Sequence, residues 1–561
     1  MSNELLKKLN GLYIKQGAVD AIDQKPKTEE IVKMSEAHDE IKPTTEQAAA
    51  LQTVTPQPSP DLLILSNDLG LKYGITDGSV ASQVFDPTTG LSNVYRVGDE
   101  LVRLQGQEFI PVDVKTLRNL IGDSYQTMAY AYQKSQVKLV NKKMSDDNAG
   151  MLLKAEARFK IPHVDIISPC PIYTNTGIQT SGVHGNVLVA GQKIERVESL
   201  PEAVELINSL IAEYEFCSLA DKSRALSMII APALKFGGLF TDRTPIFVVE
   251  ADQSQAGKGY IVVSVSKIYR GTVANVTNRT GGVGSIDESL DMAMVRGSAF
   301  ICWDNVRGRI DSQRLESLVT TTDYIDARIP HVGYCKVKPS AHVWLFTANS
   351  IEATHDIMNR SMVISIRKKP SDYVFNEWEG KGILGWIEHN QPRILGAIFR
   401  IVEEWEKAGK PVASCPFHDF RKFAGVMAWI CDKIFGLPAP SEGHLSASTL
   451  RANPTTGWLH KIAEPLVKAG KNEDLTAQDL LDLSSEFSVD APYSDVKALG
   501  RALGKVFIGD ICRIEDFEWT RTIERDYSRN FGSDANQKFE QKRYSVVNLA
   551  KTEPVSEPIN E

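Results

Sequence analysis

The chain has 561 residues, enough for about three or four domains, and its contents of 42% hydrophobic and 24% charged residues are those of an ordinary globular protein. Its formal net charge of −8 excludes a globally basic protein, so any contact with nucleic acid has to come from local patches. The seven cysteines are scattered singly, which argues against zinc fingers and a disulfide framework. We predict a cytoplasmic protein without membrane contact, because the N-terminus lacks an apolar signal core and no run of about 18 apolar residues occurs.

Composition and periodicity divide the chain into segments. Residues 1–60 are rich in Lys, Glu, Gln, Thr and Pro and predict a flexible segment. Residues 61–199 mix short strands and helices, which predicts an α+β domain. Residues 200–370 begin with helical periodicity and then alternate strands and helices, the pattern of a parallel α/β sheet; the predicted strands are PIFVVEA, AFICWDNV, AHVWLFTAN and MVISIR. The remaining predictions are a helical region, a C-terminal domain and a tail, at residues 371–440, 441–550 and 551–561.

The strand–loop–helix pattern of residues 244–271 is the strongest functional signal. An apolar run ends in a loop that carries Gly257 and Lys258, and an apolar-periodic stretch follows. Backbone N–H groups at the start of a helix can hold phosphates, and a lysine can reach the β- and γ-phosphates. The P-loop pattern GxxxxGK[ST] is met only in part, because Asp252 and Gly259 depart from it. The residues predicted to bind nucleotide are Gln255, Ala256, Gly257, Lys258, Gly259 and Tyr260.

Three polar residues follow at strand ends in the order that phosphoryl-transfer chemistry needs. Asp304 ends an apolar strand, where it can organise the water around Mg²⁺. Asn349 ends another strand and can orient an attacking water. Arg360 precedes a further strand and can reach a γ-phosphate in a neighbouring subunit. The series favours a P-loop ATPase over a doubly wound fold whose loop residues match only by coincidence.

The stretches VYRVGDELVRL, WDNV, FTANS, DIMNRS and FRKFAGVMAWI resemble the AAA+ helicase-like ATPases of phages, plasmids and integrative elements. These are related to superfamily 3 viral helicases and, more distantly, to MCM. The resemblance covers most of residues 61–548. It implies an α/β AAA+ P-loop ATPase core with an N-terminal α+β domain and a C-terminal winged-helix domain. It also implies ATP and Mg²⁺ as cofactors, a homo-hexameric ring, and DNA, a primase or other replication proteins as partners.

The sequence leaves two interpretations of the catalytic base. Asn305 stands where many AAA+ proteins have a catalytic glutamate, and an amide cannot act as a base. The Asp-Asn pair resembles that of the subgroup. Glu288, on the segment before the Asp304 strand, is the candidate base. The alternative is that Asp287 and Glu288 only cap a helix, as acids in a first turn often do.

Two basic segments are candidates for DNA contacts. Residues 326–340 predict a β-hairpin that, by the resemblance, projects into the ring and holds single-stranded DNA; its basic residues are Arg328, His331, Lys336 and Lys338. The alternative is a solvated surface hairpin. Residues 495–507 predict a helix with one basic face, formed by Lys497, Arg501 and Lys505, as a duplex-reading helix needs. The alternative is a winged helix that contacts protein.

The sequence therefore predicts an ATP-dependent DNA helicase or replication initiator of a phage or mobile element, acting as a ring on DNA. One alternative is a ring that binds nucleotide but hydrolyses it weakly and serves as a DNA-binding scaffold, because Gly259 lacks a hydroxyl and Asn305 is an amide. Another is an AAA+ ATPase for element maintenance or defence.

Overall fold

A computed structural model describes residues 62–191, 194–251, 253–271, 273–276, 284–306, 309–331, 333–349, 351–415, 419–444, 451–507, 509–526 and 539–549. The elements below all belong to one unit of the chain, residues 60–561. The predicted flexible segment and tail, residues 1–60 and 551–561, lie outside the described residues. Within the described part, no helix is long and apolar enough to span a bilayer.

The first group of elements surrounds a small core formed by residues such as Leu63, Leu117 and Ile121. A three-stranded sheet has the order β1-β5-β6, and a second sheet has the order β4-β3-β2-β7. In the second sheet, β2, β3 and β4 are joined by two consecutive antiparallel pairings. The elements are β1 (Leu62–Ile64), α2 (Asp68–Leu71), α3 (Asp77–Val84), β2 (Val94–Val97), β3 (Glu100–Gln105), β4 (Glu108–Pro111), α4 (Val114–Ser124), β5 (Gln126–Gln133), β6 (Gln136–Asn141), α5 (Asp146–Lys154) and η1 (Glu156–Lys160).

Short strands follow and lead to the main sheet. They are β7 (His163–Val164), β8 (Ile166–Ser168), β9 (Ile172–Thr174), β10 (Gly177–Gln179), β11 (Ser181–His184) and β12 (Val187–Ala190). Two helices come next, α6 (Leu200–Ile211) and α7 (Leu219–Phe236), with β13 (Glu215–Phe216) between them. The side chain of Ser218 accepts a hydrogen bond from the Asp221 amide and so caps α7.

The main sheet has six strands in the order β13-β22-β14-β20-β16-β15. All neighbours are parallel except β13, which runs antiparallel to β22. The four strands predicted between residues 244 and 367 are present as β14, β16, β20 and β22, which confirms the predicted α/β sheet. The strands and helices of this part are β14 (Ile246–Ala251), α8 (Lys258–Ile268), β15 (Val273–Asn275), α9 (Ile286–Val295), β16 (Phe300–Val306), β17 (Arg309–Ile310), α10 (Gln313–Thr320), β18 (Ile325–Ile329), β19 (Gly333–Val337), η2 (Pro339–Ala341), β20 (Val343–Ala348), β21 (Glu352–Ala353), α11 (His355–Asn359) and β22 (Ser361–Arg367).

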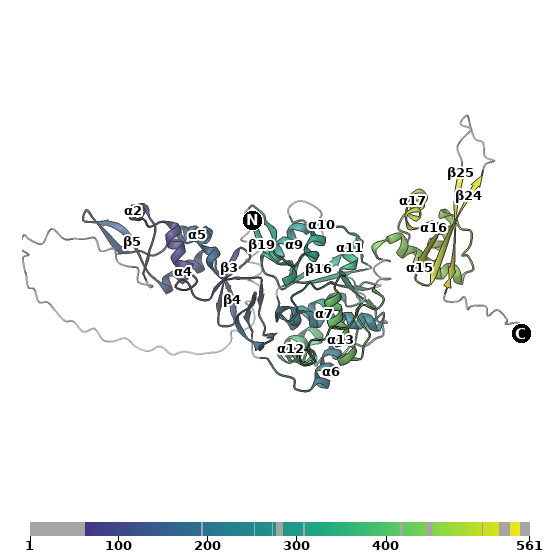
Figure 1. Cartoon of the computed structure of the whole chain (residues 1–561), viewed down its shortest axis with the longest axis horizontal. Coiled ribbons are helices and arrows are strands. Elements are labelled where there is room, and N and C mark those ends of the chain that lie inside the picture. Colours follow the sequence, from purple (N-terminus) through teal and green to yellow (C-terminus); the bar gives the residue numbers. More distant parts are fainter. Residues whose placement is uncertain are drawn as a thin grey trace, which may run out of the picture. The chain divides into compact units, whose positions relative to one another are not determined.

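Both faces of this sheet are covered, which explains why its strands are continuous apolar runs. In β14, Phe247 and Val249 enter one core cluster, while Ile246 and Val248 enter the other. The first cluster also contains apolar residues of α7, α8, α12 (Gly382–Lys407) and α13 (Arg421–Ile430), and the second contains residues of α9, α10 and α11. Figure 1 shows α7, α12 and α13 on one side of β16, with α9 and α10 on the other. A short π-helix, η3 (Cys431–Phe435), continues α13.

The last elements form a separate small core around Trp458, Leu499 and Trp519. Three helices precede a three-stranded antiparallel sheet of order β23-β24-β25. The elements are α15 (Pro454–Lys468), α16 (Ala477–Glu486), α17 (Val496–Val506), β23 (Ile511–Ile514), β24 (Phe517–Asp526) and β25 (Phe539–Asn548). Three helices and a hairpin occur in the order that the sequence predicted; their assignment as a winged helix stays a prediction.

Candidate functional site

The loop between β14 and α8 has the backbone of a phosphate-binding turn. β14 is buried along its whole length, and α8 begins at Lys258. Gly257 has φ 92°, in the left-handed region that favours glycine. A Cβ there would lie only 3.2 Å from a ring carbon of Tyr214, so close packing also requires glycine. The loop therefore ends at a helix N-terminus, a position where proteins bind anions.

Lys258 connects two of the predicted site residues that are far apart in the sequence. Its Nζ donates to Oδ1 of Asn349, at the end of β20, and lies 3.5 Å from the carbonyl oxygen of Gln253. β20 pairs directly with β14, which brings both carboxyl ends to one edge of the sheet. Parallel strands expose such loops together, and this edge is the usual ligand site of α/β sheets.

Asp304 and Asn305 share one partner, Thr347. The carboxylate oxygen Oδ1 of Asp304 accepts a hydrogen bond from the Thr347 hydroxyl at 2.5 Å. The oxygen of that hydroxyl accepts one from the backbone N–H of Asn305 at 2.7 Å. Asn305 itself has φ 51°. Thr347 is buried on β20, so it holds the end of β16 in place. Asp304 is the donor suited to a water-mediated Mg²⁺ ion; across the described residues, no group of three His, Cys, Asp or Glu could hold a metal directly.

These residues line one cavity of about 900 Å³. The predicted residues that line it are Gln255, Ala256, Gly257, Lys258, Gly259, Tyr260, Asp304, Asn305 and Asn349. Sequence reasoning missed the rest of its wall. The missed residues include Glu213, Tyr214, Thr347, Arg367, Lys368, Lys369, Tyr373, Phe375 and Trp378. A signal for some of them was available in the sequence: the run RKKPSDYVFNEW directly follows a predicted strand of the sheet.

The missed part of the wall is aromatic and is held by Glu213. Its carboxylate accepts from the Asn376 amide at 2.7 Å and from the Trp378 indole at 3.1 Å, which ties the segment after β22 to the end of α6. The rings of Tyr373 and Phe375 pack edge to face with centroids 4.9 Å apart. Burial raises the pKa of Tyr214, so its phenol stays neutral. A cavity with phosphate-binding backbone at one end and aromatic rings at another suits a nucleotide.

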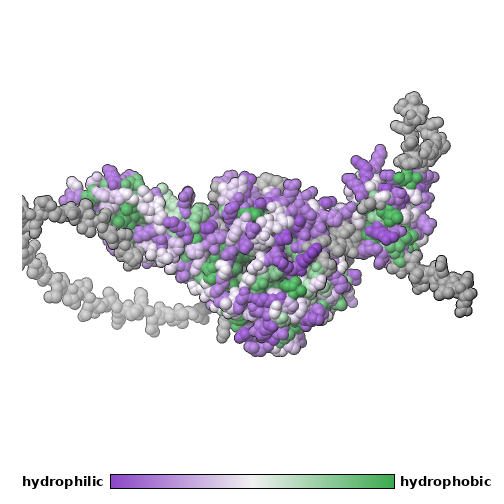
Figure 2. Space-filling view, viewed as in Figure 1, coloured by the Kyte–Doolittle hydropathy of each residue, from purple (hydrophilic) through white to green (hydrophobic). Residues whose placement is uncertain are grey.

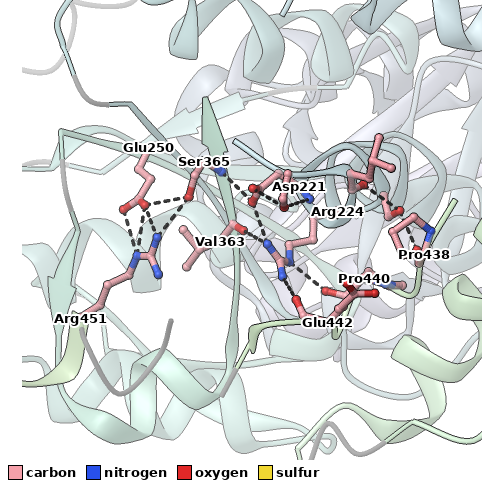
Figure 3. Close-up of polar contacts among 12 residues, drawn as sticks. Asp221, Arg224, Glu250, Val363, Ser365, Pro438, Pro440, Glu442 and Arg451 are labelled. Atoms are coloured by element: carbon pink, nitrogen blue, oxygen red, sulfur yellow. Dashed lines mark hydrogen bonds and ion pairs between the residues drawn. The ribbon is translucent and has the colours of Figure 1, made fainter. Parts of the chain in front are cut away.

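An ion pair between the buried Glu250 and the partly buried Arg451 anchors the strand that leads into the loop (Figure 3). The Glu250 carboxylate, on β14, accepts from the guanidinium of Arg451, from the Ser365 hydroxyl at 2.9 Å and from the Ile351 amide at 3.2 Å. Burial raises the pKa of Glu250, but the Arg451 charge and the hydrogen bonds from Arg451, Ser365 and Ile351 together outweigh burial and hold the pKa below the ordinary value. Beside it, Arg224 bonds to Asp221 and to the carbonyl oxygens of Pro440 and Glu442.

Arg360 lies at the opposite end of the sheet from the cavity. Its carbonyl oxygen accepts from the amide of Ile246, the first residue of β14, at 2.9 Å. Its guanidinium lies 3.5 Å from Asp356 and 3.4 Å from Asp419, and its side chain is 16% exposed. Arg360 therefore does not line the site of its own subunit, which agrees with a role in trans but does not test it.

Glu288 makes the contacts of a helix cap. Its Oε2 accepts from the Gly284 amide at 3.0 Å, and its own amide donates to Ser285 Oγ at 3.3 Å. Ser285 is thus the N-cap of α9, and the Glu288 carboxylate bonds the backbone of the residue before that cap. Glu288 is not among the residues that line the cavity. The geometry thus favours the capping alternative for this residue.

The predicted DNA hairpin is formed by β18 and β19, and its basic residues differ in their surroundings. Arg328 pairs across the ladder with Tyr334, which is 73% exposed. Lys336 lies 3.0 Å from Asp326 in an exposed ion pair. Lys338 lies beyond β19, with its Nζ 5.8 Å from the ring centre of Tyr324. His331 lies in the turn with φ 62°.

The basic helix of the C-terminal part is α17. Leu499 and Leu503 are buried on one side, while Lys497, Arg501 and Lys505 are exposed on the other. Within the described part of the chain, none of these three cations has a carboxylate within ion-pair distance, and Arg501 Nε bonds only the Lys497 carbonyl oxygen at 3.3 Å. The amphipathic helix that the sequence predicted is therefore present; its partner is not established by these contacts.

The chain matches no known protein family and no curated protein. Among solved structures it is similar to the apo C-terminal region of NrS-1, at 11% identity and a TM-score of 0.32, over 81% of this chain and 96% of that one. It is also similar to Cch, an active helicase of SCCmec type IV, at 10% identity and a TM-score of 0.33, over 82% and 93%. For the JCV helicase the values are 14% and 0.21, over 46% and 73%.

Proposed function

We propose that this chain is an ATP-dependent DNA helicase or replication initiator of a phage or mobile element, with an AAA+ core that acts as a homo-hexameric ring. The observation that carries the proposal is the contact between Lys258 and Asn349 inside a cavity that also holds Asp304. A P-loop lysine, a water-orienting amide and a Mg²⁺-organising carboxylate stand at three neighbouring strand ends.

Each residue has a separate role in this proposal. Lys258 and the amides of the loop bind the β- and γ-phosphates, and Asn349 orients the attacking water. Asp304, held by Thr347, would hold Mg²⁺ through water. The metal would offset negative charge on the phosphates when bound. The aromatic wall around Tyr214 and Tyr373 would bind the nucleobase of the nucleotide. We assign no catalytic base, because the candidate, Glu288, bonds the backbone at the start of α9 and does not line the cavity.

The turnover rate decides between this proposal and its rivals. Gly259 lacks the hydroxyl that would bind Mg²⁺, although no atom lies within 4 Å of the position of a Cβ there. Asn305 is an amide and cannot act as a base. Both departures favour a nucleotide-binding scaffold with weak hydrolysis. We would measure ATP turnover and strand displacement, with and without single-stranded DNA, on protein of known oligomeric state. Hydrolysis stimulated by DNA is expected. Binding without turnover would favour the scaffold, and turnover indifferent to DNA would favour maintenance or defence.

Replacing Arg360 by alanine is expected to leave ATP binding intact and to lower hydrolysis about 10³-fold or more, the effect of losing an arginine finger. The test of a trans role is a mixture of Arg360→Ala with Lys258→Ala subunits. Some mixed interfaces then regain an intact P-loop and an arginine, so activity should partly return. If co-assembled rings stay inactive and the variant merely melts earlier, Arg360 only holds Asp356 and Asp419.

The two basic elements are expected to differ in their DNA preference. Neutralising Lys336 and Lys338 should reduce hydrolysis stimulated by single strands, whereas neutralising Lys497, Arg501 and Lys505 should weaken duplex binding and leave basal hydrolysis unchanged. Each phosphate contact that is lost should flatten the log–log salt slope by about 0.9 for duplex and about 0.7 for single strands. Binding of both DNA forms across salt measures this. An unchanged duplex slope would instead assign α17 to protein docking.

A further inference from the structure

Three tyrosines gather on one surface of the sheet β1-β5-β6. Tyr130 and Tyr132 are two residues apart on β5, so their side chains leave the same face of the sheet. Tyr73, just after α2, stacks on Tyr130 with ring centroids 4.5 Å apart and ring planes 21° apart. Figure 1 draws α2 beside β5 at the same end of this part of the chain. We call Tyr73, Tyr130 and Tyr132 the tyrosine face.

The tyrosine face is exposed although the opposite face of β5 is packed. Ala129 is 4% exposed and belongs to the core of this region, so the small residue points inward. Tyr132 is 67% exposed and Tyr73 is 51% exposed. Figure 2 shows hydrophobic residues at the surface near α2 and β5, among hydrophilic ones. Core packing therefore does not explain why three aromatic rings line this face.

The surroundings of the tyrosine face are positively charged. Residues 126–143 contain four lysines and no aspartate or glutamate, in a chain whose net charge is −8. Lys134 lies in the β5–β6 turn, Lys138 on β6, and Lys142 and Lys143 directly after β6. All four are exposed, and within the described residues none is in an ion pair. Because β6 is the outer strand of its sheet, these lysines border the open edge.

We propose that the tyrosine face binds single-stranded DNA, with its rings stacked on bases and the bordering lysines on phosphates. Stacked aromatic rings beside a basic edge are the elements of sequence-tolerant single-strand binding. Tyr130 and Tyr132 are roughly 6.6 Å apart, two steps of a strand. Tyr73 covers one face of the Tyr130 ring, so the exposed rings of Tyr73 and Tyr132 can each meet a different base. Duplex DNA does not fit, since its bases are already stacked. The choice of DNA as the polymer rests on the proposed function.

The test is binding of a fluorescein-labelled oligo(dT) to the full-length chain without nucleotide. In all proteins tested, Lys336 and Lys338 are replaced by neutral residues, so that DNA binding by the β18–β19 hairpin does not mask binding by the tyrosine face. Tyr132→Ala and Tyr73→Ala should each weaken binding between about fivefold and about 150-fold, the range for loss of one stacked base. Tyr132→Trp should preserve it. Leu71→Ala, a change of an exposed apolar neighbour that is not aromatic, should leave the affinity unchanged.

Location and polymer class are tested in parallel. A 4-thiothymidine oligonucleotide should cross-link to the peptide of residues 126–143. Cross-linking without any ATP turnover would refute the proposed function and leave the tyrosine face as a DNA site. DNA-stimulated turnover with unchanged affinity in Tyr73→Ala/Tyr132→Ala would overturn the present inference alone. Binding to vesicles containing phosphatidylserine but not to oligo(dT), or equal loss in Leu71→Ala, would overturn it in favour of a membrane or a protein partner.

Discussion

Lys258→Ala is expected to abolish ATP turnover and to weaken ATP binding, while the chain stays folded. The substitution removes the positive charge that would meet the β- and γ-phosphates and the contact of that charge with Asn349. The side chain is only partly buried, in the wall of the cavity, so the free energy of unfolding should change by about 0.5 kcal/mol or less. Nucleotide binding by calorimetry and phosphate release measure the first effect, and thermal unfolding measures the second.

The matched control is Lys267→Ala on the same helix. Lys267 forms a surface ion pair with Glu388 at 2.8 Å and does not line the cavity. Its loss should cost about 0–1 kcal/mol of stability and leave turnover unchanged. If Lys258→Ala retained the ATP affinity and turnover of the parent, or if both variants lost activity equally, the assignment of the P-loop would be wrong.

Arg451→Ala is expected to have the largest effect on stability, a loss of about 3–5 kcal/mol in the free energy of unfolding. Among the described residues, the variant leaves the buried carboxylate of Glu250 with the Ser365 hydroxyl (Figure 3) and the Ile351 backbone amide as its partners. Glu250 lies on β14, so the disturbance should also lower ATP affinity. Urea unfolding of both proteins measures the difference.

The pH dependence of this effect has a defined sign. The Glu250 pKa is held below the ordinary value of 4.5, so the ion pair stabilises the fold above about pH 4.5 and loses this effect as the carboxylate is protonated at lower pH. The difference in the free energy of unfolding between the parent protein and Arg451→Ala should therefore become smaller as the pH is lowered. As a control, Arg513→Ala breaks an ion pair in which Arg513 is 70% exposed, and should cost about 0–1 kcal/mol. Equal losses in the two variants would contradict the buried-pair argument.

The sequence alone determined the strands of the α/β sheet and the order of its polar strand ends. Continuous apolar runs such as those around Val248 and Phe346 identify strands buried on both faces, because apolar residues occupy successive positions and therefore both faces of the strand. The Gly257-Lys258 pair identified the loop, since a glycine with positive φ and a lysine are local requirements. The basic stripe of α17 was also readable, because helical periodicity places residues four apart on one side.

The tertiary structure decided which of these residues meet. Strand order places β20 beside β14 and so joins Lys258 to Asn349, 91 positions away, whereas no local pattern encodes that neighbourhood. Packing also separated residues that looked alike in sequence: Lys336 faces Asp326, while Lys338 lies near Tyr324. The tertiary structure also directs the Glu288 carboxylate to the backbone at the start of α9, and it leaves the tyrosine face exposed to solvent. Such outcomes depend on long-range contacts between elements, which periodicity and spacing along the chain do not specify.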